Sequence, residues 1–351
     1  MTDPLTWAAP VAAGPVDATV RVPGSKSLTN RWLVVAALAE GPSLLHGPLR
    51  SQDSRAMVEA LRTLGVTVDD AREDRWRVVP PERLRGSVEI DCHQAGTVMR
   101  FLAPVAALAD GPVRVDGHPS ARSRPVGPML MALRDLGVDV EDDGRGTLPY
   151  TVLGTGGVPG GRVRIDASAS SQFVSALLLA APRFTAGLDL EHTGDALPSL
   201  PHVDMTVAVL RQAGVHVDRP GATSWTVRPG PVQGVDVQIE PDLSSAAPFL
   251  ALAAVSGGRV SVPGWPVGTT QPGDRLPEIL ELMGARTVRD GAGLTVHGPP
   301  DGRLRGDLDL DLSDVGSSPP WWPPCASWPA PRAGSAGWRT CAATRPTGSR
   351  R

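Results

Sequence analysis

The sequence predicts an α/β protein built from repeated β-α-β-α-β-β units, and three observations indicate this fold class. A helical phrase with regularly spaced leucines, followed by a glycine and a short strand, occurs four times, starting at Met57, Met129, Met205 and Leu276. A second phrase, in which a strand leads through a polar turn into an Ala/Leu-rich helix, begins near residues 19, 87, 162, 237 and 308. The two phrases alternate with a period of roughly 70 residues, which is typical of a chain made of structural repeats.

Each helical phrase has apolar residues at positions i, i+3 or i+4, and i+7, the pattern of an amphipathic helix. The glycine that follows suits a helix end that needs a positive φ angle, and it occurs at Gly65, Gly137, Gly214 and Gly284. In the second phrase a polar turn always precedes a helix. Unpaired backbone N–H groups and the positive end of the helix dipole therefore coincide at each polar turn, which favours anion binding.

A chain of 351 residues is too long for one ordinary core and suggests two domains. We expect a second domain with three repeats over residues 20–233, and an incomplete first domain formed by residues 1–19 and 234–316. Residues 317–351 have no helical or strand periodicity, and they hold four of the nine tryptophans, several beside prolines. We predict that this last segment is an aberrant, disordered tail.

The composition excludes several classes of function. A hydrophobic content of 41% supports a packed core, and a net charge of −3 does not indicate nucleic acid or an anionic membrane as partner. The three cysteines lack metal-ligand spacing, so neither a zinc site nor a disulfide framework is expected. No signal peptide and no apolar run approaching about 20 residues is found, which favours a cytoplasmic protein.

The first two polar turns carry candidate anion-binding residues. In residues 23–31, Gly24 allows a tight bend, and Lys26, Ser27 and Arg31 bring two positive charges and a hydroxyl near one helix start. The alternative is a Ser/Thr cap with solvated Lys and Arg. In residues 93–100, Gly96 permits close backbone approach to an anion, and Thr97 is expected to cap the helix. Taken alone, the capping interpretation is favoured for this second turn.

Further candidates lie downstream. Arg122 and Arg124 stand beside Pro125, so their side chains are partly pre-oriented for a phosphate or carboxylate, although a basic surface loop would look the same. A later turn offers hydroxyls and an amide that suit a polyhydroxylated phosphate ester, while a plain serine cap would need only one of them. That turn contains Ser170, Ser171 and Gln172. The equivalent place in the next repeat holds Asp242, Ser244 and Ser245, for which a purely structural role is the alternative, and Ser199 also precedes a repeat helix.

Together, the segments PGSKSLTNR, AGTVMRF, RSRPVGPM and SSQFVSALL, in this order, resemble the enolpyruvyl transferase family over roughly residues 15–316. Serine after Lys26 points to the shikimate branch, the 5-enolpyruvylshikimate-3-phosphate synthases. This resemblance implies two domains of three units each. It also implies transfer of the enolpyruvyl group of phosphoenolpyruvate to the 5-hydroxyl of shikimate 3-phosphate, with release of phosphate. A monomer without metal or cofactor is expected.

The resemblance also implies roles for individual residues. Lys26, Ser27 and Arg31 would bind shikimate 3-phosphate, and Lys26 would also contact phosphoenolpyruvate as the catalytic lysine. The remaining assignments are Gly96 and Arg124 for phosphoenolpyruvate, and Ser170, Ser171, Gln172 and Ser199 for the phosphate and ring of shikimate 3-phosphate. Three positions depart from the family, since Gln94, Phe101 and His202 stand where many relatives have Asn, Pro and Tyr.

The tail departs from the family more strongly. Ser317 stands where the family has the acidic general base, and the later His-Glu-Thr-Asp-Arg stretch and further cationic residues are missing, so we expect the chain as written to be inactive. Shifting the reading frame of the tail recovers both features. Trp321 and Trp322 then give Val and Ala without choice of codon, the segment from Ser317 can read Glu-Leu-Thr-Pro-Val-Val-Ala-Ala-Leu, and the last residues can contain His-Glu-Thr-Asp-Arg. The sequence thus predicts a single insertion or deletion near the codon of Gly316.

Two alternatives stay open at this point. A UDP-N-acetylglucosamine enolpyruvyl transferase usually carries Asn after the first Lys and a Cys in the Arg-rich loop, whereas Ser27 follows Lys26 here and residues 116–128 contain no Cys. A non-catalytic remnant that binds shikimate 3-phosphate is the alternative from a different class, because the three-repeat domain is complete. Isothermal titration separates binding from turnover.

Overall fold

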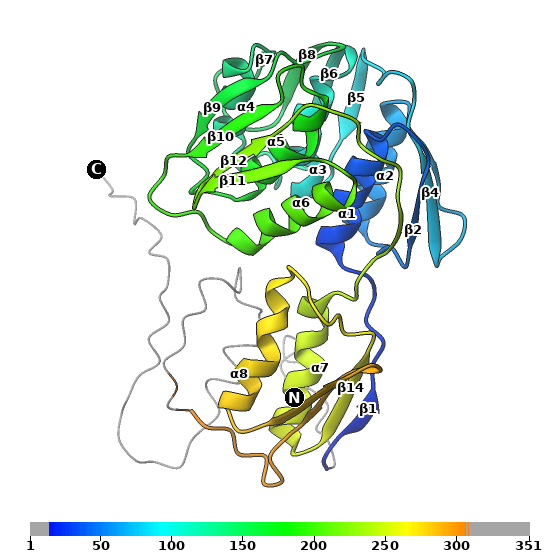
Figure 1. Ribbon diagram of the computed structural model, residues 1–351, viewed down its shortest axis with the longest axis vertical. Helices are drawn as coiled ribbons and strands as arrows, with labels where there is room; N and C mark the ends of the chain where they lie inside the picture. Colours follow the sequence, from blue (N-terminus) through cyan, green and yellow to red (C-terminus); the bar gives the residue numbers. More distant parts are fainter. Residues whose placement is uncertain (1–13, 307, 309–351) are drawn as a thin grey trace, which may run out of the picture. The chain divides into compact units, whose positions relative to one another are not determined.

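The computed structural model describes residues 14–306 and 308. The chain divides into two compact units, a larger one over Pro23–Asp242 and a smaller one that combines the residues before and after it (Figure 1). Ser317 and the predicted tail at 317–351 lie outside the described residues. None of the described helices is both long enough and apolar enough to cross a membrane.

The larger unit contains three repeats of helices and strands. The first repeat contributes α1 (Lys26–Ala37), β2 (Ser43–His46), α2 (Gln52–Thr63), β3 (Thr67–Asp69) and β4 (Arg75–Val79). The second consists of β5 (Val88–Asp91), α3 (Gly96–Ala106), β6 (Asp110–Asp116), α4 (Gly127–Asp135), β7 (Asp139–Glu141) and β8 (Tyr150–Thr155). The third consists of β9 (Gly161–Ile165), α5 (Gln172–Ala180), a short 3-10 helix η1 (Ala181–Arg183), β10 (Leu188–His192), α6 (Leu200–Gln212), β11 (Val217–Gly221) and β12 (Ser224–Val227).

The smaller unit holds one further repeat. Its elements are β1 (Asp17–Thr19), α7 (Leu243–Ser256), β14 (Arg259–Pro263), a 3-10 helix η2 (Pro272–Arg275), α8 (Leu276–Leu282), β15 (Arg286–Asp290) and β16 (Gly293–His297). The strand β13 (Asp236–Gln238) precedes α7 in the chain but belongs to the larger unit. The alternation of strands and helices confirms the predicted α/β class.

Each repeat forms a four-stranded sheet, and all four sheets have the same strand order. In the second repeat this order is β5-β6-β8-β7, with β5 parallel to β6 and the other pairs antiparallel. Two strands are exchanged between the units. β1, which precedes the first repeat, pairs in parallel with β14, and β13, which precedes the fourth, pairs in parallel with β2. The exchange means that the chain enters the larger unit just before α1 and leaves it just before α7.

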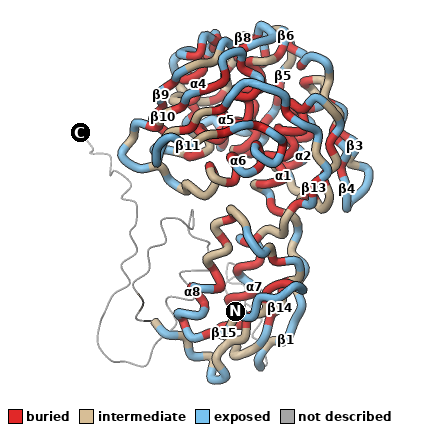
Figure 2. The backbone as a smooth tube through the Cα atoms, viewed as in Figure 1, coloured by how far each residue is buried: buried red, intermediate tan, exposed pale blue. Residues whose placement is uncertain are grey.

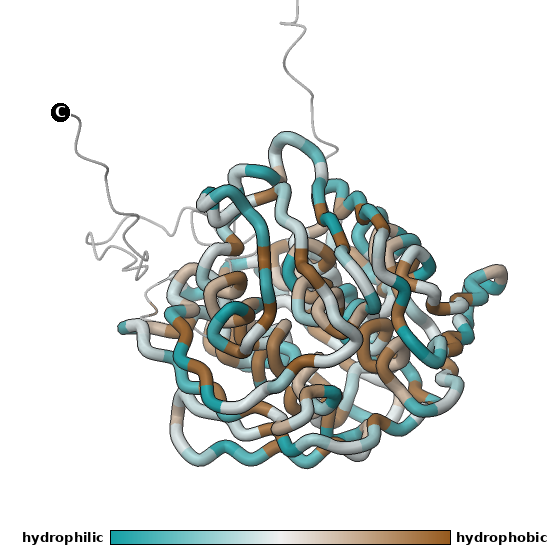
Figure 3. Tube along the Cα trace, turned by 90° about the horizontal axis from the view of Figure 1, so that it is seen from above, coloured by the Kyte–Doolittle hydropathy of each residue, from teal (hydrophilic) through white to brown (hydrophobic). Residues whose placement is uncertain are grey.

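The core of the larger unit is helical. α3 packs against α5, and α1 contacts both, so these three helices are buried over most of their length (Figure 2). In α5 every residue after Gln172 is buried, and burial of each large apolar side chain stabilises the fold by about 1.5–3 kcal/mol. Figure 3 shows hydrophobic segments through this interior and hydrophilic ones along many outer turns.

The glycines that follow the second helix of each repeat have the predicted backbone conformation. Their φ angles are +96° at Gly65, +84° at Gly137, +79° at Gly214 and +102° at Gly284. Residues with a Cβ rarely adopt such angles, so glycine ends these helices at low cost. The predicted helix ends are confirmed.

Candidate functional site

The first polar turn places Lys26 at the start of α1. Ser25 is the N-cap and accepts a hydrogen bond from the amide of Leu28 (3.5 Å), while the amide of Lys26 donates to Oδ2 of Asp242 (3.1 Å). The ammonium of Lys26 forms an ion pair with Oδ2 of Asp53 at 3.2 Å. Asp53 lies in the first turn of α2 and was not among the predicted site residues, although an acidic residue after the cap Ser51 is a sequence signal that could have pointed to it.

The tight bend predicted at Gly24 has a steric reason. A Cβ at this position would lie 2.1 Å from the carbonyl oxygen of Gly47, so no larger residue fits without moving the backbone. This close approach fixes the chain directly ahead of Lys26.

Arg31 is fully buried and connects four helices. Its Nε donates to Thr206 Oγ1 (2.8 Å), one Nη to the carbonyl of Ser27 (2.9 Å), and the other to the carbonyl of His202 (2.8 Å) and to Ser175 Oγ (3.4 Å). The guanidinium also stacks 5.3 Å from the ring centroid of Phe101. Burial lowers the pKa of Arg31 to about 9. The positive charge of Arg31 therefore lies where α1, α3, α5 and α6 meet, and all of its hydrogen bonds are to neutral protein groups.

α3 begins at Gly96 without a side-chain cap, since its N-cap is Ala95. The prediction that Thr97 caps this helix is wrong, because the Thr97 hydroxyl instead accepts a hydrogen bond from Asn30 Nδ2 of α1 at 2.8 Å. The first backbone bond of this helix runs from the amide of Met99 to the carbonyl of Ala95 (3.1 Å). The preceding amides therefore lie ahead of the helical bonding pattern and are available to an anion.

Three polar side chains converge on Gly96. A Cβ there would lie 3.5 Å from Arg100 Nη1, 3.6 Å from Arg124 Nη1 and 3.7 Å from Gln172 Oε1. These contacts bring together the second polar turn (Gly96, Arg100), the Arg-rich loop (Arg124) and the third polar turn (Gln172). The assignment of these segments to one site requires such proximity. Because Gly96 has a hydrogen in place of a Cβ atom, a small anion can approach its backbone between the two guanidinium groups.

The two guanidinium groups are held by neutral acceptors. Arg100 Nη1 donates to Gln172 Oε1 (2.7 Å), and Arg124 Nη1 donates to the carbonyl of Gln94 (2.8 Å). Burial, with a smaller effect from the charge of Arg124, lowers the pKa of Arg100 to about 10. By contrast, Arg122 is neutralised by both carboxylate oxygens of Asp116, at 2.9 and 2.8 Å.

Over the described residues, no carboxylate lies within 4.0 Å of either Arg100 or Arg124. Two uncompensated cations beside a free helix start form a good environment for an anion. Arg100 was absent from the predicted site residues, and the signal that could have found it is its position one helical turn after Gly96.

Of Ser170 and Ser171 in the third turn, only Ser170 uses its hydroxyl at the start of α5. Ser171 is the N-cap of α5 but makes no cap hydrogen bond with its side chain, and Ser170 Oγ accepts from the amide of Gln172 (3.3 Å). Ser199, the N-cap of α6, has a φ angle of +53° and also makes no side-chain cap bond. A left-handed conformation is uncommon for serine, and such strain tends to occur at functional sites.

His202 lies in the first turn of α6 close to Arg31. Burial, and to a lesser degree the charge of Arg31, lower the pKa of His202 to about 4. The imidazole is therefore neutral at physiological pH, with one donor and one acceptor nitrogen.

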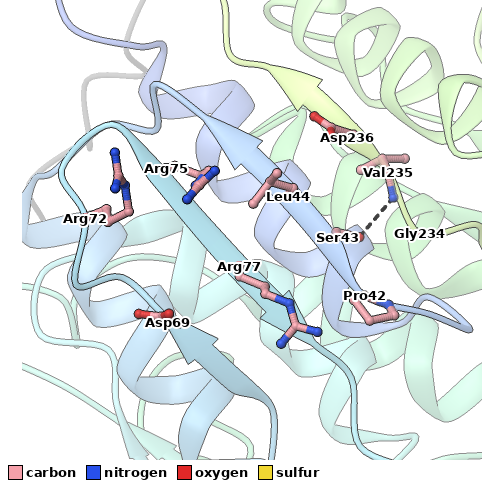
Figure 4. A pocket seen from close by; sticks show the side chains of 10 residues that line it. All are labelled: Pro42, Ser43, Leu44, Asp69, Arg72, Arg75, Arg77, Gly234, Val235 and Asp236. Atoms are coloured by element: carbon pink, nitrogen blue, oxygen red, sulfur yellow. Dashed lines mark hydrogen bonds between the residues drawn. The ribbon is translucent and has the colours of Figure 1, made fainter.

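Two surface pockets can be compared with this arrangement. One, with a volume of about 360 Å³, is lined in part by Asp53 and Gln94, the partners of Lys26 and Arg124. The other, of about 550 Å³, lies on the exposed face of the first repeat's sheet, where β2, β4 and β13 run side by side (Figure 4). Its arginines include Arg75 and Arg77, and none of the predicted site residues lines it.

Comparison with known proteins assigns the chain to a family. The model of the EPSP synthase family, described as 3-phosphoshikimate 1-carboxyvinyltransferase, matches residues 11–316. A 3-phosphoshikimate 1-carboxyvinyltransferase of Kocuria rhizophila is 55% identical over 327 residues, which cover 90% of this chain and 72% of that protein.

Solved structures share the fold. An EPSP synthase from Acinetobacter baumannii superposes with a TM-score of 0.71 at 23% identity, covering 86% of this chain and 69% of that one. A second EPSP synthase structure from the same organism gives a TM-score of 0.69 at 23% identity. The two-domain enolpyruvyl transferase fold expected from the sequence is thereby confirmed. On the extent of the family match and the identity to the Kocuria protein, the chain belongs to the EPSP synthase family, the 3-phosphoshikimate 1-carboxyvinyltransferases.

Proposed function

We propose that the larger unit of this chain binds the two substrates of its family, shikimate 3-phosphate and phosphoenolpyruvate, at the first turns of α1, α3, α5 and α6. The family's reaction transfers the enolpyruvyl group to the 5-hydroxyl of shikimate 3-phosphate and releases phosphate. The observation that carries the proposal is the environment of Gly96, where free amides of α3 face two guanidinium groups without carboxylate partners.

In this proposal Arg100, Arg124 and the amides of α3 hold an anionic group of phosphoenolpyruvate against Gly96. Charge-assisted hydrogen bonds from a bidentate guanidinium are about twice as strong as neutral ones, which suits a doubly anionic substrate. Lys26 approaches from α1 and exchanges its partner Asp53 for the substrate. In the addition–elimination reaction, these cations stabilise charge on the carboxylate and phosphate groups while the shikimate 5-hydroxyl attacks C2.

Shikimate 3-phosphate is assigned to the neighbouring turns. Ser171 and Ser199 offer hydroxyls that are not used for capping, and Ser170 and Gln172 flank Ser171 in the chain. Arg31 supports this half of the site through the carbonyls of Ser27 and His202. A polyhydroxylated ring with one phosphate matches such a set of hydroxyls, an amide and a nearby buried cation.

We further propose that the chain as written binds substrate but does not turn over. Ser317 replaces the acidic base implied by the resemblance, and the family match ends at residue 316. Loss of a general base alone lowers the rate by on the order of a hundredfold or more. The match to the EPSP synthase family supports this branch over the UDP-N-acetylglucosamine enolpyruvyl transferases. A monomer located in the cytoplasm is part of the same proposal.

Isothermal titration of the full chain with shikimate 3-phosphate tests the proposal. Binding that weakens at least tenfold in Ser171→Ala and Gln172→Ala is the expected result. An exposed hydroxyl residue at the end of β8, outside the polar turns, provides the control Thr155→Ala. Equal affinity in all variants would contradict the assignment, and phosphate release from phosphoenolpyruvate at a normal enzymatic rate would contradict the predicted inactivity.

A further inference from the structure

The first polar turn contains a residue for which the substrate assignments leave no role. Asn30 lies in α1 and is completely buried, and its Nδ2 donates to Thr97 Oγ1 of α3 at 2.8 Å. The other end of the same amide, Oδ1, is buried and has no hydrogen-bond partner in the part of the chain that the structure describes.

A buried acceptor without a hydrogen bond destabilises a fold, so its presence in a side chain calls for an explanation other than stability. Asn30 gains one hydrogen bond and leaves another group unpaired, which is a poor contribution to folding. The single bond that it makes, however, is to the residue that follows Gly96. The bond therefore acts at the one helix start where the Arg100 and Arg124 guanidinium groups converge.

Helix starts are usually fixed by a side-chain cap, which uses up first-turn amides as donors. α3 has no such cap, and the amides of Gly96, Thr97 and Val98 precede its first backbone bond. An uncapped turn is expected to fray. A sideways bond to the Thr97 hydroxyl restrains the turn and leaves all of these amides free for a ligand.

We propose that Asn30 is a positioning residue that fixes the first turn of α3 in a conformation ready to bind the phosphoenolpyruvate anion. It acts through Thr97 and does not touch substrate. Because Asn30 is adjacent to Arg31 on α1, the same bond also sets the distance between the proposed shikimate 3-phosphate and phosphoenolpyruvate halves of the site. This inference rests on the proposed function.

Thr97→Val tests it, because valine keeps the shape of threonine and removes the acceptor of the Asn30 bond. In the full chain, phosphoenolpyruvate is titrated in the presence of saturating shikimate 3-phosphate, and the backbone amide resonance of Gly96 is followed by NMR. We expect the affinity for phosphoenolpyruvate to fall about tenfold, the equivalent of one hydrogen bond. The affinity for shikimate 3-phosphate, measured by isothermal titration, should change by less than about twofold.

Two variants complete the design. Thr97→Ser retains the hydroxyl and should restore phosphoenolpyruvate binding, and Asn30→Leu combined with Thr97→Val should be no weaker than Thr97→Val alone, since both remove one bond. Unchanged phosphoenolpyruvate affinity in Thr97→Val overturns the inference. Equal losses for both ligands overturn it too, because a general loss of structure explains them. If phosphoenolpyruvate does not shift the Gly96 amide in the unmodified chain, the proposed function fails at α3 and the inference fails with it.

Discussion

Gly96→Ala separates the binding role of the α3 start from its structural role. The new methyl would lie 3.5 Å from Arg100 Nη1, 3.6 Å from Arg124 Nη1 and 3.7 Å from Gln172 Oε1, all ordinary contact distances. The fold therefore has room for it, and alanine is the better helix former by up to about 1 kcal/mol. We expect the free energy of unfolding to stay within about 1 kcal/mol of the original value.

Anion binding should respond very differently. An oxygen that accepts from both guanidinium groups at ordinary hydrogen-bond distances would occupy the space that the methyl fills. Loss of at least one charge-assisted bond costs about 1.5–3 kcal/mol, or a roughly 10- to 150-fold weaker affinity for phosphoenolpyruvate. Isothermal titration in the presence of shikimate 3-phosphate measures this change, and thermal unfolding measures stability.

A glycine outside the site supplies the control for this experiment. At Gly41 a Cβ would meet no atom within 4 Å, so Gly41→Ala should leave both quantities unchanged. The reasoning is refuted if Gly96→Ala binds phosphoenolpyruvate as tightly as the parent chain. It is also refuted if the variant loses affinity only in proportion to a loss of folded protein.

Three further predictions concern pH, an ion pair and the reading frame. Folding lowers the pKa of His202 from 6.5 to about 4, so between these pH values the unfolded chain binds a proton at His202 and the folded chain does not. The free energy of unfolding therefore falls by up to about 3 kcal/mol as the pH drops from 6.5 to 4. His202→Phe should remove that part of the acid dependence in urea unfolding and the exposed-site control His216→Gln should not. Asp53→Asn releases Lys26, so phosphate should bind a few-fold tighter by titration while stability changes by less than about 1 kcal/mol; weaker binding would contradict this. Sequencing the locus should find the shifted frame near the codon of Gly316, and a repaired chain should release phosphate from the two substrates; a locus whose alternate frame lacks His-Glu-Thr-Asp-Arg would disprove the frame shift.

The sequence predicted the helices of the fold better than the pairing of its strands. Leucine spacing and the glycines after each second helix indicated α2, α4, α6 and α8, because helix periodicity and C-cap conformation are local properties. Local patterns did not indicate that β13, which lies within the residues 234–316 expected in the first domain, pairs with β2 of the larger unit. Strand periodicity shows which residues face a core, but the choice of partner depends on contacts between segments such as Asp236–Gln238 and Ser43–His46, about 190 residues apart in sequence.

Within the candidate site, residue types were easier to predict than contacts. Gly96, Arg124 and Gln172 were expected in one site, and the structure brings all three together. The bonds from Arg100 to Gln172 and from Asn30 to Thr97 join different repeats, and no local pattern reveals them. Thr97 was misjudged as a cap because threonine near a helix start usually has that role, and a tertiary partner took its hydroxyl instead.

The backbone amides in the first turn of α3 have fewer hydrogen-bond acceptors than those of the other helices of the larger unit. Elsewhere a cap or a neighbouring carbonyl takes up at least one of them, as Ser25 does for α1, Ser51 for α2 and the carbonyl of Gly146 for α4. In α5 the Ser170 hydroxyl accepts from the amide of Gln172, and in α6 the carbonyl of Ser199 accepts from the amide of His202. A helix start that lacks such partners is expected to be the least stable of the set, unless something outside the protein completes it. At α3 the two uncompensated guanidinium groups indicate the charge of that missing partner, so the same feature that weakens the fold locally specifies an anion.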